Sequence, residues 1–280
     1  MSTTTTTTDA QASNSPGLPG VLTVGWQRAK FDVRNFFRQK DAVGFTLAFP
    51  VMILLLFGAI FKGKVEGTNV DYTQVLVAGI LASGIASVSF VSLSIGICVE
   101  RSNGTLKRLA GTPMPRVSYF LGKVGLVLTT ALIETVLILG IGVALFNLHL
   151  PADAGHWFTF AWVFLIGITA CTLLGVAMSA VPRSEKSAAA VVNLPFVALQ
   201  FISGVFVQYS SLPSGLRMIA SIFPLKWLAQ GFRSVFLPDS FLVAEPGGSW
   251  QHPAMVLVLA GWCLAGLVLC RVSFRWGTER

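Results

Sequence analysis

Long continuous runs of hydrophobic residues dominate the chain, and short polar segments separate them. These runs predict six membrane-spanning helices, with approximate bounds 42–61, 73–98, 118–146, 157–181, 188–207 and 254–271. Each run is close to the roughly 20 residues that a helix needs to cross the hydrocarbon core of a bilayer. Strands of a transmembrane barrel would instead show segments of about ten residues with alternating polarity. The pattern therefore predicts an all-α polytopic membrane protein.

Residues 21–41 follow a different pattern, in which apolar residues recur at helical spacing beside basic ones. The apolar arc holds Leu22, Trp26, Ala29, Val33, Phe36 and Phe37, and the neighbouring polar arc holds Gln27, Lys30, Arg34, Arg38 and Asp41. A basic amphipathic helix of this kind lies in the membrane interface, and packing on a partner protein is the alternative. The hydrophobic run that follows at once favours the interface. Residues 1–20, rich in Thr, Ser, Pro and Gly, are expected to be a disordered tail.

The segment between the fifth and the last span is apolar without forming a full span. Pro213 and Pro224 each precede a short apolar stretch, and proline is favourable at the first position of a helix. Two short apolar helices between full spans predict a re-entrant hairpin over 208–236. Such backbone is stable at membrane depth only when it packs against protein or lines a water-filled cavity.

Composition and charge exclude several classes of protein. Of the 280 residues, 54% are hydrophobic and 11% are charged, whereas soluble domains carry about 25% charged residues. An ordinary soluble enzyme is therefore excluded. The net charge of +8 would indicate a nucleic-acid partner in a soluble protein, but in a membrane protein basic residues gather in cytoplasmic loops. We therefore expect the chain to lie in a lipid bilayer and to have no nucleic-acid partner.

The basic residues also predict an orientation. With the N-terminus inside, 15 of the 20 Lys and Arg residues fall on the cytoplasmic side and 5 on the other side. Because Lys and Arg mark the cytoplasmic loops, both termini are expected in the cytoplasm, with residues 276–280 as a short cytoplasmic tail.

The chain shows no pattern of catalytic or metal-ligating residues. It lacks a phosphate-binding loop of the form Gly-x4-Gly-Lys-Ser/Thr. His149, His156 and His252 have no metal-ligand spacing, and the four cysteines lie inside or at the ends of apolar runs without paired spacing. We therefore expect a non-catalytic subunit that holds no metal and no cofactor.

The loop at residues 99–117 after the second span is the most informative polar segment. Ser102 or Asn103 is placed to cap a short helix, and Pro113 helps to end it. Leu106, Leu109 and Ala110 would form a small apolar patch beside Lys107 and Arg108. The loop is then either a compact docking surface or an ordinary solvated connection.

The sequence Glu-Arg-x-x-Gly-Thr-Leu at 100–106, followed by Thr112-Pro113 and by Leu-Gly-Lys at 121–123, strongly resembles the membrane subunits of ABC-2-type exporters, the daunorubicin-resistance-like permeases. The resemblance covers about residues 21–275. It implies a pair of permease subunits, as a homodimer or a heterodimer, around a central pathway. It also implies a separate ATP-binding cassette subunit, which would hold ATP and Mg. The residues implied in coupling to that subunit are Glu100, Arg101, Gly104, Thr105, Leu106, Leu109, Thr112, Pro113, Trp26 and Arg34.

The resemblance implies a permease that exports hydrophobic or amphipathic cargo, such as an antibiotic, a drug or a lipid, from the plasma (inner) membrane of a prokaryote. A polysaccharide or glycolipid exporter is an alternative within the same class. A transporter-like sensing or immunity module and a secondary transporter are the alternatives from other classes.

Four polar or aromatic residues within the predicted spans are candidates for the substrate pathway. Glu134 is the only acidic residue within the spans, and a charged group at that depth is a functional hypothesis by default. It would either line the pathway and meet cationic groups of the cargo, or be protonated or hydrogen-bonded to a neighbouring helix. Asn193, Gln200 and Phe201 of the fifth span either line the pathway or join helices.

Overall fold

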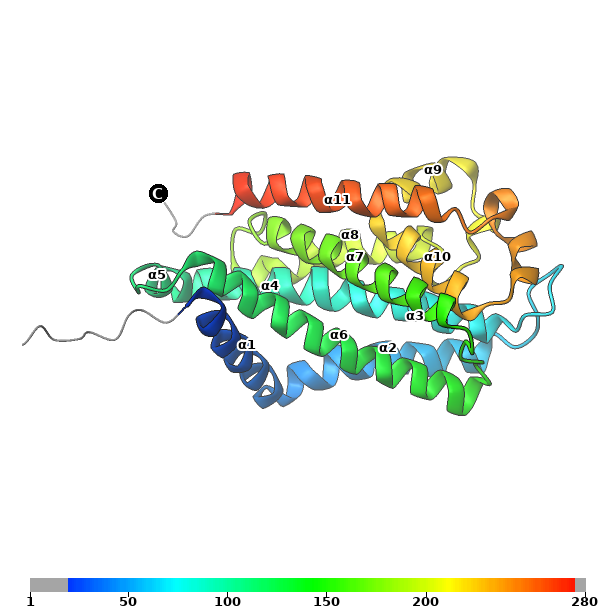
Figure 1. The fold of residues 1–280 in the computed structure, drawn as a ribbon, viewed down its shortest axis with the longest axis horizontal. Coiled ribbons are helices and arrows are strands. Elements are labelled where there is room, and N and C mark those ends of the chain that lie inside the picture. Colours follow the sequence, from blue (N-terminus) through cyan, green and yellow to red (C-terminus); the bar gives the residue numbers. More distant parts are fainter. Residues whose placement is uncertain (1–19, 275–280) are drawn as a thin grey trace, which may run out of the picture.

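The computed structural model describes residues 20–274, which form a bundle of α-helices (Figure 1). The predicted tails at 1–20, Gly20 apart, and 276–280 lie outside the described residues. No β-strand occurs within 20–274, so the all-α prediction is confirmed. The α-helices are α1 (Val21–Arg38), α2 (Lys40–Ile60), α3 (Tyr72–Ala86), α4 (Leu93–Ser102), α5 (Thr105–Ala110), α6 (Arg116–Phe146), α7 (Ala154–Met178), α8 (Glu185–Ile202), α9 (Ser214–Ile222), α10 (Pro224–Phe236) and α11 (His252–Ser273).

Five helical segments within 20–274 are long and apolar enough to cross a membrane. They are α2, the continuous helix Tyr72–Ser102, α6, α7 and α11. That continuous helix comprises α3, a π-helical stretch η1 (Ser87–Ser92) and α4. The multi-pass membrane character predicted from the sequence is therefore confirmed.

The fifth predicted span, 188–207, is not among these five. Its helix α8 ends at Ile202 and has 18 residues, or about 27 Å of helix. Glu185, Lys186, Asn193 and Gln200 lower its hydropathy. In Figure 1, α8 nevertheless runs along the bundle, and it packs mainly against α4. Because α8 makes this further pass, the start of α1 and the end of α11 lie at the same end of the bundle as α5 (Figure 1). We call this end the α5 end.

The hairpin predicted at 208–236 is present as α9 and α10. Pro213 precedes α9 as its cap residue, whereas Pro224 occupies the first turn of α10. All 13 residues of α10 are buried. α10 packs against α3, α7 and α11, so it is an internal layer of the bundle, whereas α9 has Ala220 as its one buried residue and lies at the surface.

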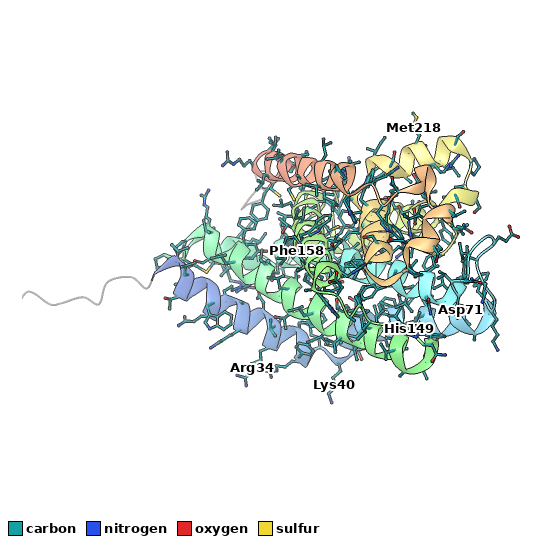
Figure 2. The ribbon with its side chains drawn as sticks, turned by 45° about the vertical axis from the view of Figure 1, so that its right-hand side comes forward. Arg34, Lys40, Asp71, His149, Phe158 and Met218 are labelled. Carbon is teal, nitrogen blue, oxygen red and sulfur yellow. The ribbon has the colours of Figure 1, made fainter. Side chains whose placement is uncertain are left out.

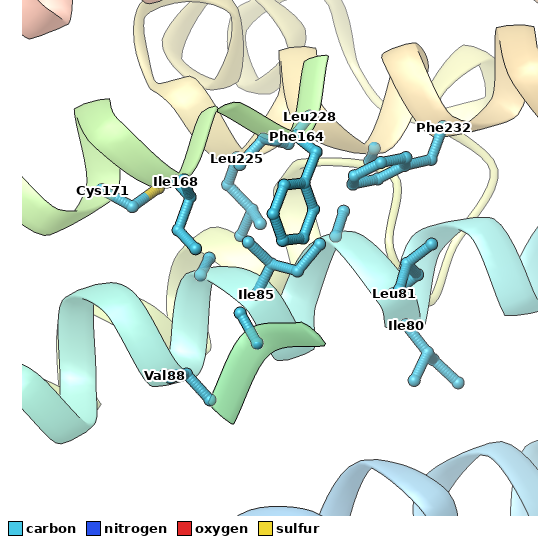
Figure 3. Close-up of a cluster of buried hydrophobic side chains, with 14 of the residues drawn as sticks. Ile80, Leu81, Ile85, Val88, Phe164, Ile168, Cys171, Leu225, Leu228 and Phe232 are labelled. Carbon is cyan, nitrogen blue, oxygen red and sulfur yellow. The ribbon is translucent and has the colours of Figure 1, made fainter. Parts of the chain in front are cut away.

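The core lies where α3, α7 and α10 meet (Figure 3). All residues of α3 from Val75 to Ala86 are buried, and they contact α6 and α2 as well as α7 and α10. A helix that is apolar on every side belongs in the centre of a bundle. α3 is therefore the central helix of the chain, and the more exposed helices α2 and α11 lie at the periphery.

Candidate functional site

The chain reverses direction between α4 and α5 at Gly104. This residue has φ +70° and directly precedes α5. Only glycine adopts this left-handed conformation without a steric cost. Gly104 therefore permits the turn that leads into α5. The cap predicted at Ser102 or Asn103 is wrong, because Gly104 precedes α5 and Ser102 Oγ donates to Val99 O of its own helix.

Leu106 does not form the exposed apolar knob that the loop pattern predicted. Its side chain is 1% exposed and belongs to the main hydrophobic core. Leu109 is half-buried against the same core, and Thr105 is half-buried. Leu106 is the buried residue of the six-residue helix α5. It therefore anchors α5 to the core of this chain. The exposed side of the loop consists of Lys107, Arg108, Ala110, Gly111, Thr112 and Pro113.

Glu100 is the centre of a cluster of charged residues beside α5. One carboxylate oxygen, Oε1, lies 2.6 Å from Lys123 Nζ and 3.6 Å from Arg28 Nη2. The other, Oε2, accepts a hydrogen bond of 2.7 Å from the Tyr119 hydroxyl. Glu100 does not pair with its neighbour Arg101. Arg101 instead donates to Pro182 O at 2.9 Å, ahead of α8.

Asp32 of α1 completes this cluster, which we call the charge network (Arg28, Asp32, Glu100, Tyr119 and Lys123). Asp32 Oδ1 lies 3.1 Å from Arg28 Nη2, and Oδ2 lies 3.4 Å from Lys123 Nζ. The Asp32 side chain is only 4% exposed. Burial raises the pKa of Asp32, although the cations of Lys123 and Arg28 oppose this shift.

The charge network joins three separate segments: α1, the end of α4 and the start of α6. The sequence analysis did not single out Arg28 and Asp32, and it treated Lys123 only as part of the Leu-Gly-Lys motif at 121–123. The available signal was the spacing of Arg28 and Asp32, which places opposite charges one turn apart on a helix.

Glycines allow α1 to lie close against α6. A Cβ atom on Gly125 would meet the Ala29 Cβ at 2.6 Å, and one on Gly25 would meet Leu121 at 2.8 Å. One on Gly122 would meet the side chain of Arg28. The glycine of the Leu-Gly-Lys motif thus makes room for Arg28, and the next residue, Lys123, forms the ion pairs of the network.

The opposite side of α1 points away from the bundle. Trp26 is 63% exposed, and Arg34 is exposed and points outward in Figure 2. The buried residues of the helix are Gly25, Ala29 and Asp32. The apolar arc predicted from the sequence therefore faces the surroundings in part, which fits a helix in the membrane interface.

A cavity of about 760 Å³ lies beside the charge network, between α1, α2, η1, α4 and α6. Its polar side includes Asp32, Glu100 and Lys123, and its apolar walls include Phe45 and Leu126. Such a cavity has the dimensions of a small-molecule site. Its lining suits an amphipathic molecule.

The candidate pathway residues are dispersed and do not form one site. Glu134 is fully buried and packs so closely on α3 that a Cβ atom on Gly84 would collide with its carboxylate. Gln200 Nε2 donates to Ser83 Oγ at 2.5 Å and joins α8 to α3. Asn193 Nδ2 donates to Ala189 O of its own helix, and Phe201 is 51% exposed. The pathway role of these residues stays a prediction.

Among residues 20–274, no group of three or more His, Cys, Asp or Glu side chains is placed to hold a metal ion. The four cysteines, Cys98, Cys171, Cys263 and Cys270, are free thiols.

The helical membrane fold, the α4–α5 turn and the charge network define a polytopic membrane protein with a cluster of charged residues beside the α4–α5 turn. The ABC-2 type transporter family matches residues 26–237. This match covers most of the 280 residues. The chain belongs to the ABC-2 type transporter family, as its resemblance to ABC-2-type permeases predicted.

Two relatives show the range of similarity. A protein of Porphyra purpurea named as a transport permease, ycf38, is 26% identical over 194 residues, which are 67% of this chain and 65% of that protein. A protein of Escherichia coli K12 named as a multidrug ABC transporter permease, YbhR, is 22% identical over 189 residues, which are 68% of this chain and 50% of that protein. The aligned part thus spans between half and two thirds of these relatives.

Proposed function

We propose that this chain is the permease subunit of an ABC exporter, driven by a separate ATP-binding cassette subunit that holds ATP and Mg. The permease would pair with a second permease subunit and perform no catalysis itself. The cargo would be hydrophobic or amphipathic, such as an antibiotic, a drug or a lipid. Membership of the ABC-2 family supports the transport role, and the name of the Escherichia coli relative supports multidrug cargo.

The charge network carries this proposal. A permease driven by ATP that another subunit binds needs a mechanical link between the surface that contacts this subunit and its own membrane-spanning helices. Here Glu100 lies four residues before the turn at Gly104, and its ion pair with Lys123 holds this segment to α6. Arg28 and Asp32 attach α1 to the same point. A displacement of α5 by a partner would therefore move α1, α4 and α6 together.

The exposed surface of α5 favours an acidic partner surface. Lys107 and Arg108 are exposed on α5, and Arg34 adds an exposed cation on α1 (Figure 2). Exposed cations steer association with a surface of opposite charge. If ATP binding to the partner changes the conformation of the permease, the contacts between the two subunits must differ between the two conformations. The exposed side chains of α5 and α1 are available to make such contacts.

The deciding experiment measures partner binding, ATPase activity and transport on the same preparations. We expect the chain to co-purify with the ATP-binding subunit encoded beside it, and ATPase activity to rise with an amphipathic cation such as a fluorescent dye. Lys107→Glu/Arg108→Glu should weaken partner binding, whereas the control Lys62→Glu/Lys64→Glu, exposed in the 61–71 loop, should not. Wild-type binding and dye export by the α5 variant would refute the coupling role.

The same preparations separate the alternatives. Stimulation by a lipid-linked glycan and not by dyes would favour a polysaccharide or glycolipid exporter. A complex that binds ATP and alters a signalling partner without moving cargo would favour a sensing module. The amphipathic lining of the 760 Å³ cavity favours the small-molecule exporter.

We place the chain in the plasma membrane of a prokaryote with both termini in the cytoplasm. The 15-to-5 distribution of basic residues supports this orientation. Cysteines introduced at Asn69 and Asp153 should react with an impermeant thiol reagent in intact cells, and one at Ser102 should react only after the membrane is opened. A background without the four native cysteines is needed. Labelling at Ser102 in intact cells would reverse the orientation.

A further inference from the structure

A second cleft, of about 430 Å³, lies away from the charge network, between α9 and the first turn of α10. We propose that this cleft binds the phosphate of an anionic phospholipid, with Lys226 and Arg217 as its cations. The inference requires only that the chain is embedded in a membrane and does not depend on export. It concerns residues that neither the coupling loop nor the candidate pathway uses.

Lys226 is a buried cation without a matching anion. Its side chain is on the fully buried helix α10 and the residue is 3% exposed, yet it lines the cleft. Within residues 20–274 the Lys226 ammonium forms no hydrogen bond and no ion pair; its contacts are the rings of Trp227, at 3.3 Å, and Tyr209, at 5.3 Å. A lysine ammonium carries three N–H donors. The faces of aromatic rings attract its charge but do not accept conventional hydrogen bonds, as the oxygens of an anion do.

Glu245, the carboxylate that attracts Lys226 electrostatically, already forms an ion pair with another residue. Glu245 Oε1 lies 2.5 Å from Arg233 Nε, and both side chains are 3% exposed. Arg233 also donates to Gly204 O at 3.2 Å. Glu245 thus forms its ion pair with Arg233, and Lys226 has no ion pair among residues 20–274.

Arg217 brings a second cation to the cleft. It lies on α9, is half-buried and lines the cleft beside Ser214, Ser221 and Gln251. Within the described residues its guanidinium forms no ion pair, and the contact of Arg217 with Tyr209 uses the backbone oxygen, which accepts from the hydroxyl at 2.6 Å. Two cations with hydroxyl and amide groups around one cleft match the oxygens of a phosphate.

The rest of the cleft indicates that the phosphate belongs to a lipid. Met218 lines the cleft, is 72% exposed and points away from the bundle in Figure 2. Leu216, Ile219 and Ile222 of the same helix are 39%, 47% and 56% exposed. An apolar helix face of this kind is favourable against acyl chains. Trp227 and Tyr209 at the cleft are the residues that gather at the level of lipid headgroups.

The test compares lipid retention by variants of the full chain in nanodiscs and in mild detergent, measured by native mass spectrometry. The probes are dioleoylphosphatidylglycerol, dioleoylphosphatidylcholine and inorganic phosphate. Lys226→Met keeps the apolar stem against Trp227 and removes the charge. Arg217→Gln changes a residue on the short helix α9, and Lys64→Gln, in the 61–71 loop, is the matched control.

We expect the wild type and Lys64→Gln to retain phosphatidylglycerol in preference to phosphatidylcholine. Each cleft variant should weaken phosphatidylglycerol binding about fivefold, as expected for the loss of one basic residue at a membrane surface. Inorganic phosphate at millimolar concentration should not displace the lipid.

Equal retention by the wild type and both cleft variants would overturn the proposal. An equal loss in Lys64→Gln would overturn it too, because the attraction would then be general. Binding of inorganic phosphate with the same dependence on Lys226 would overturn the assignment to a lipid. If Lys226→Met fails to fold, as judged by its melting temperature, Arg217→Gln decides the outcome alone.

Discussion

Lys123 and Glu100 form a close ion pair, with Nζ 2.6 Å from Oε1, and thereby join the third predicted span to the segment that leads into α5. The two side chains are 7% and 21% exposed. A partly buried ion pair adds little net stability, because the cost of desolvation opposes the attraction between the charges. Its main effect is to fix the position of α4 relative to α6. Its value to an ABC-2 permease is that it fixes α5 relative to α6.

The first prediction concerns this pair. Lys123→Met should lower the free energy of unfolding by about 1–3 kcal/mol, because Glu100 and Asp32 lose one of their two cations in the charge network and keep only Arg28 there. Glu100→Gln/Lys123→Met should be more stable than the sum of the single variants predicts, with a coupling of about 1–3 kcal/mol. Denaturant unfolding in detergent measures both. Additive effects would show that the two residues act independently.

The second prediction concerns Asp32. Burial raises its pKa above the ordinary value of 3.8, so the folded state binds this proton more tightly than the unfolded state does. Between 3.8 and the raised pKa, the free energy of unfolding therefore falls as the pH rises. Asp32→Asn should remove that part of the pH dependence. Melting temperatures of both proteins across pH 4–8 test it, and an unchanged pH profile would contradict it.

The third prediction concerns the contact of α1 with α6. Gly125→Ala would place a Cβ atom 2.6 Å from the Ala29 Cβ, and overpacking of this kind costs about 1–3 kcal/mol. Gly140→Ala is the matched control on the same helix, because nothing lies within 4 Å of its Cβ position. We expect proteases to cleave α1 faster in Gly125→Ala and not in Gly140→Ala. Equal cleavage would show that α1 tolerates displacement.

The fourth prediction distinguishes two roles of Leu106. Because its side chain is buried in this chain, Leu106→Ala should lower the free energy of unfolding of the isolated permease by about 2–5 kcal/mol. Lys107→Ala, exposed on the same helix, should leave it within experimental error. If Leu106 were instead an apolar knob for the ATP-binding subunit, Leu106→Ala would weaken partner binding alone and leave the isolated permease as stable as before.

The fifth prediction concerns Glu134. Glu134→Gln preserves the shape that packs against Gly84, so we expect normal assembly and normal basal ATPase activity. Glu134→Leu removes the polar group and serves as the comparison. If Glu134 meets the cargo, export of cationic dyes should fall in Glu134→Gln while neutral cargo is unaffected. Unchanged export of both cargo types would remove Glu134 from the pathway and leave it a packing role.

Local sequence patterns determined most of the helices. The hydropathy of each run and the prolines at 213 and 224 predicted the long spans and the two short helices α9 and α10. The φ of Gly104 followed from the need for a turn. These features depend on neighbouring residues and on the thickness of a bilayer, so they can be inferred without knowing which helices touch.

The sequence by itself thus determined an all-α membrane protein of the ABC-2 type. Only the tertiary structure decided that Glu100 pairs with Lys123, 23 residues away, that Leu106 faces inward, and that α10 is buried on all sides. A hydropathy pattern states how apolar a side chain is and not which helix lies against it. Ion pairs and buried faces arise from helix packing, and packing brings together residues that are distant in the chain.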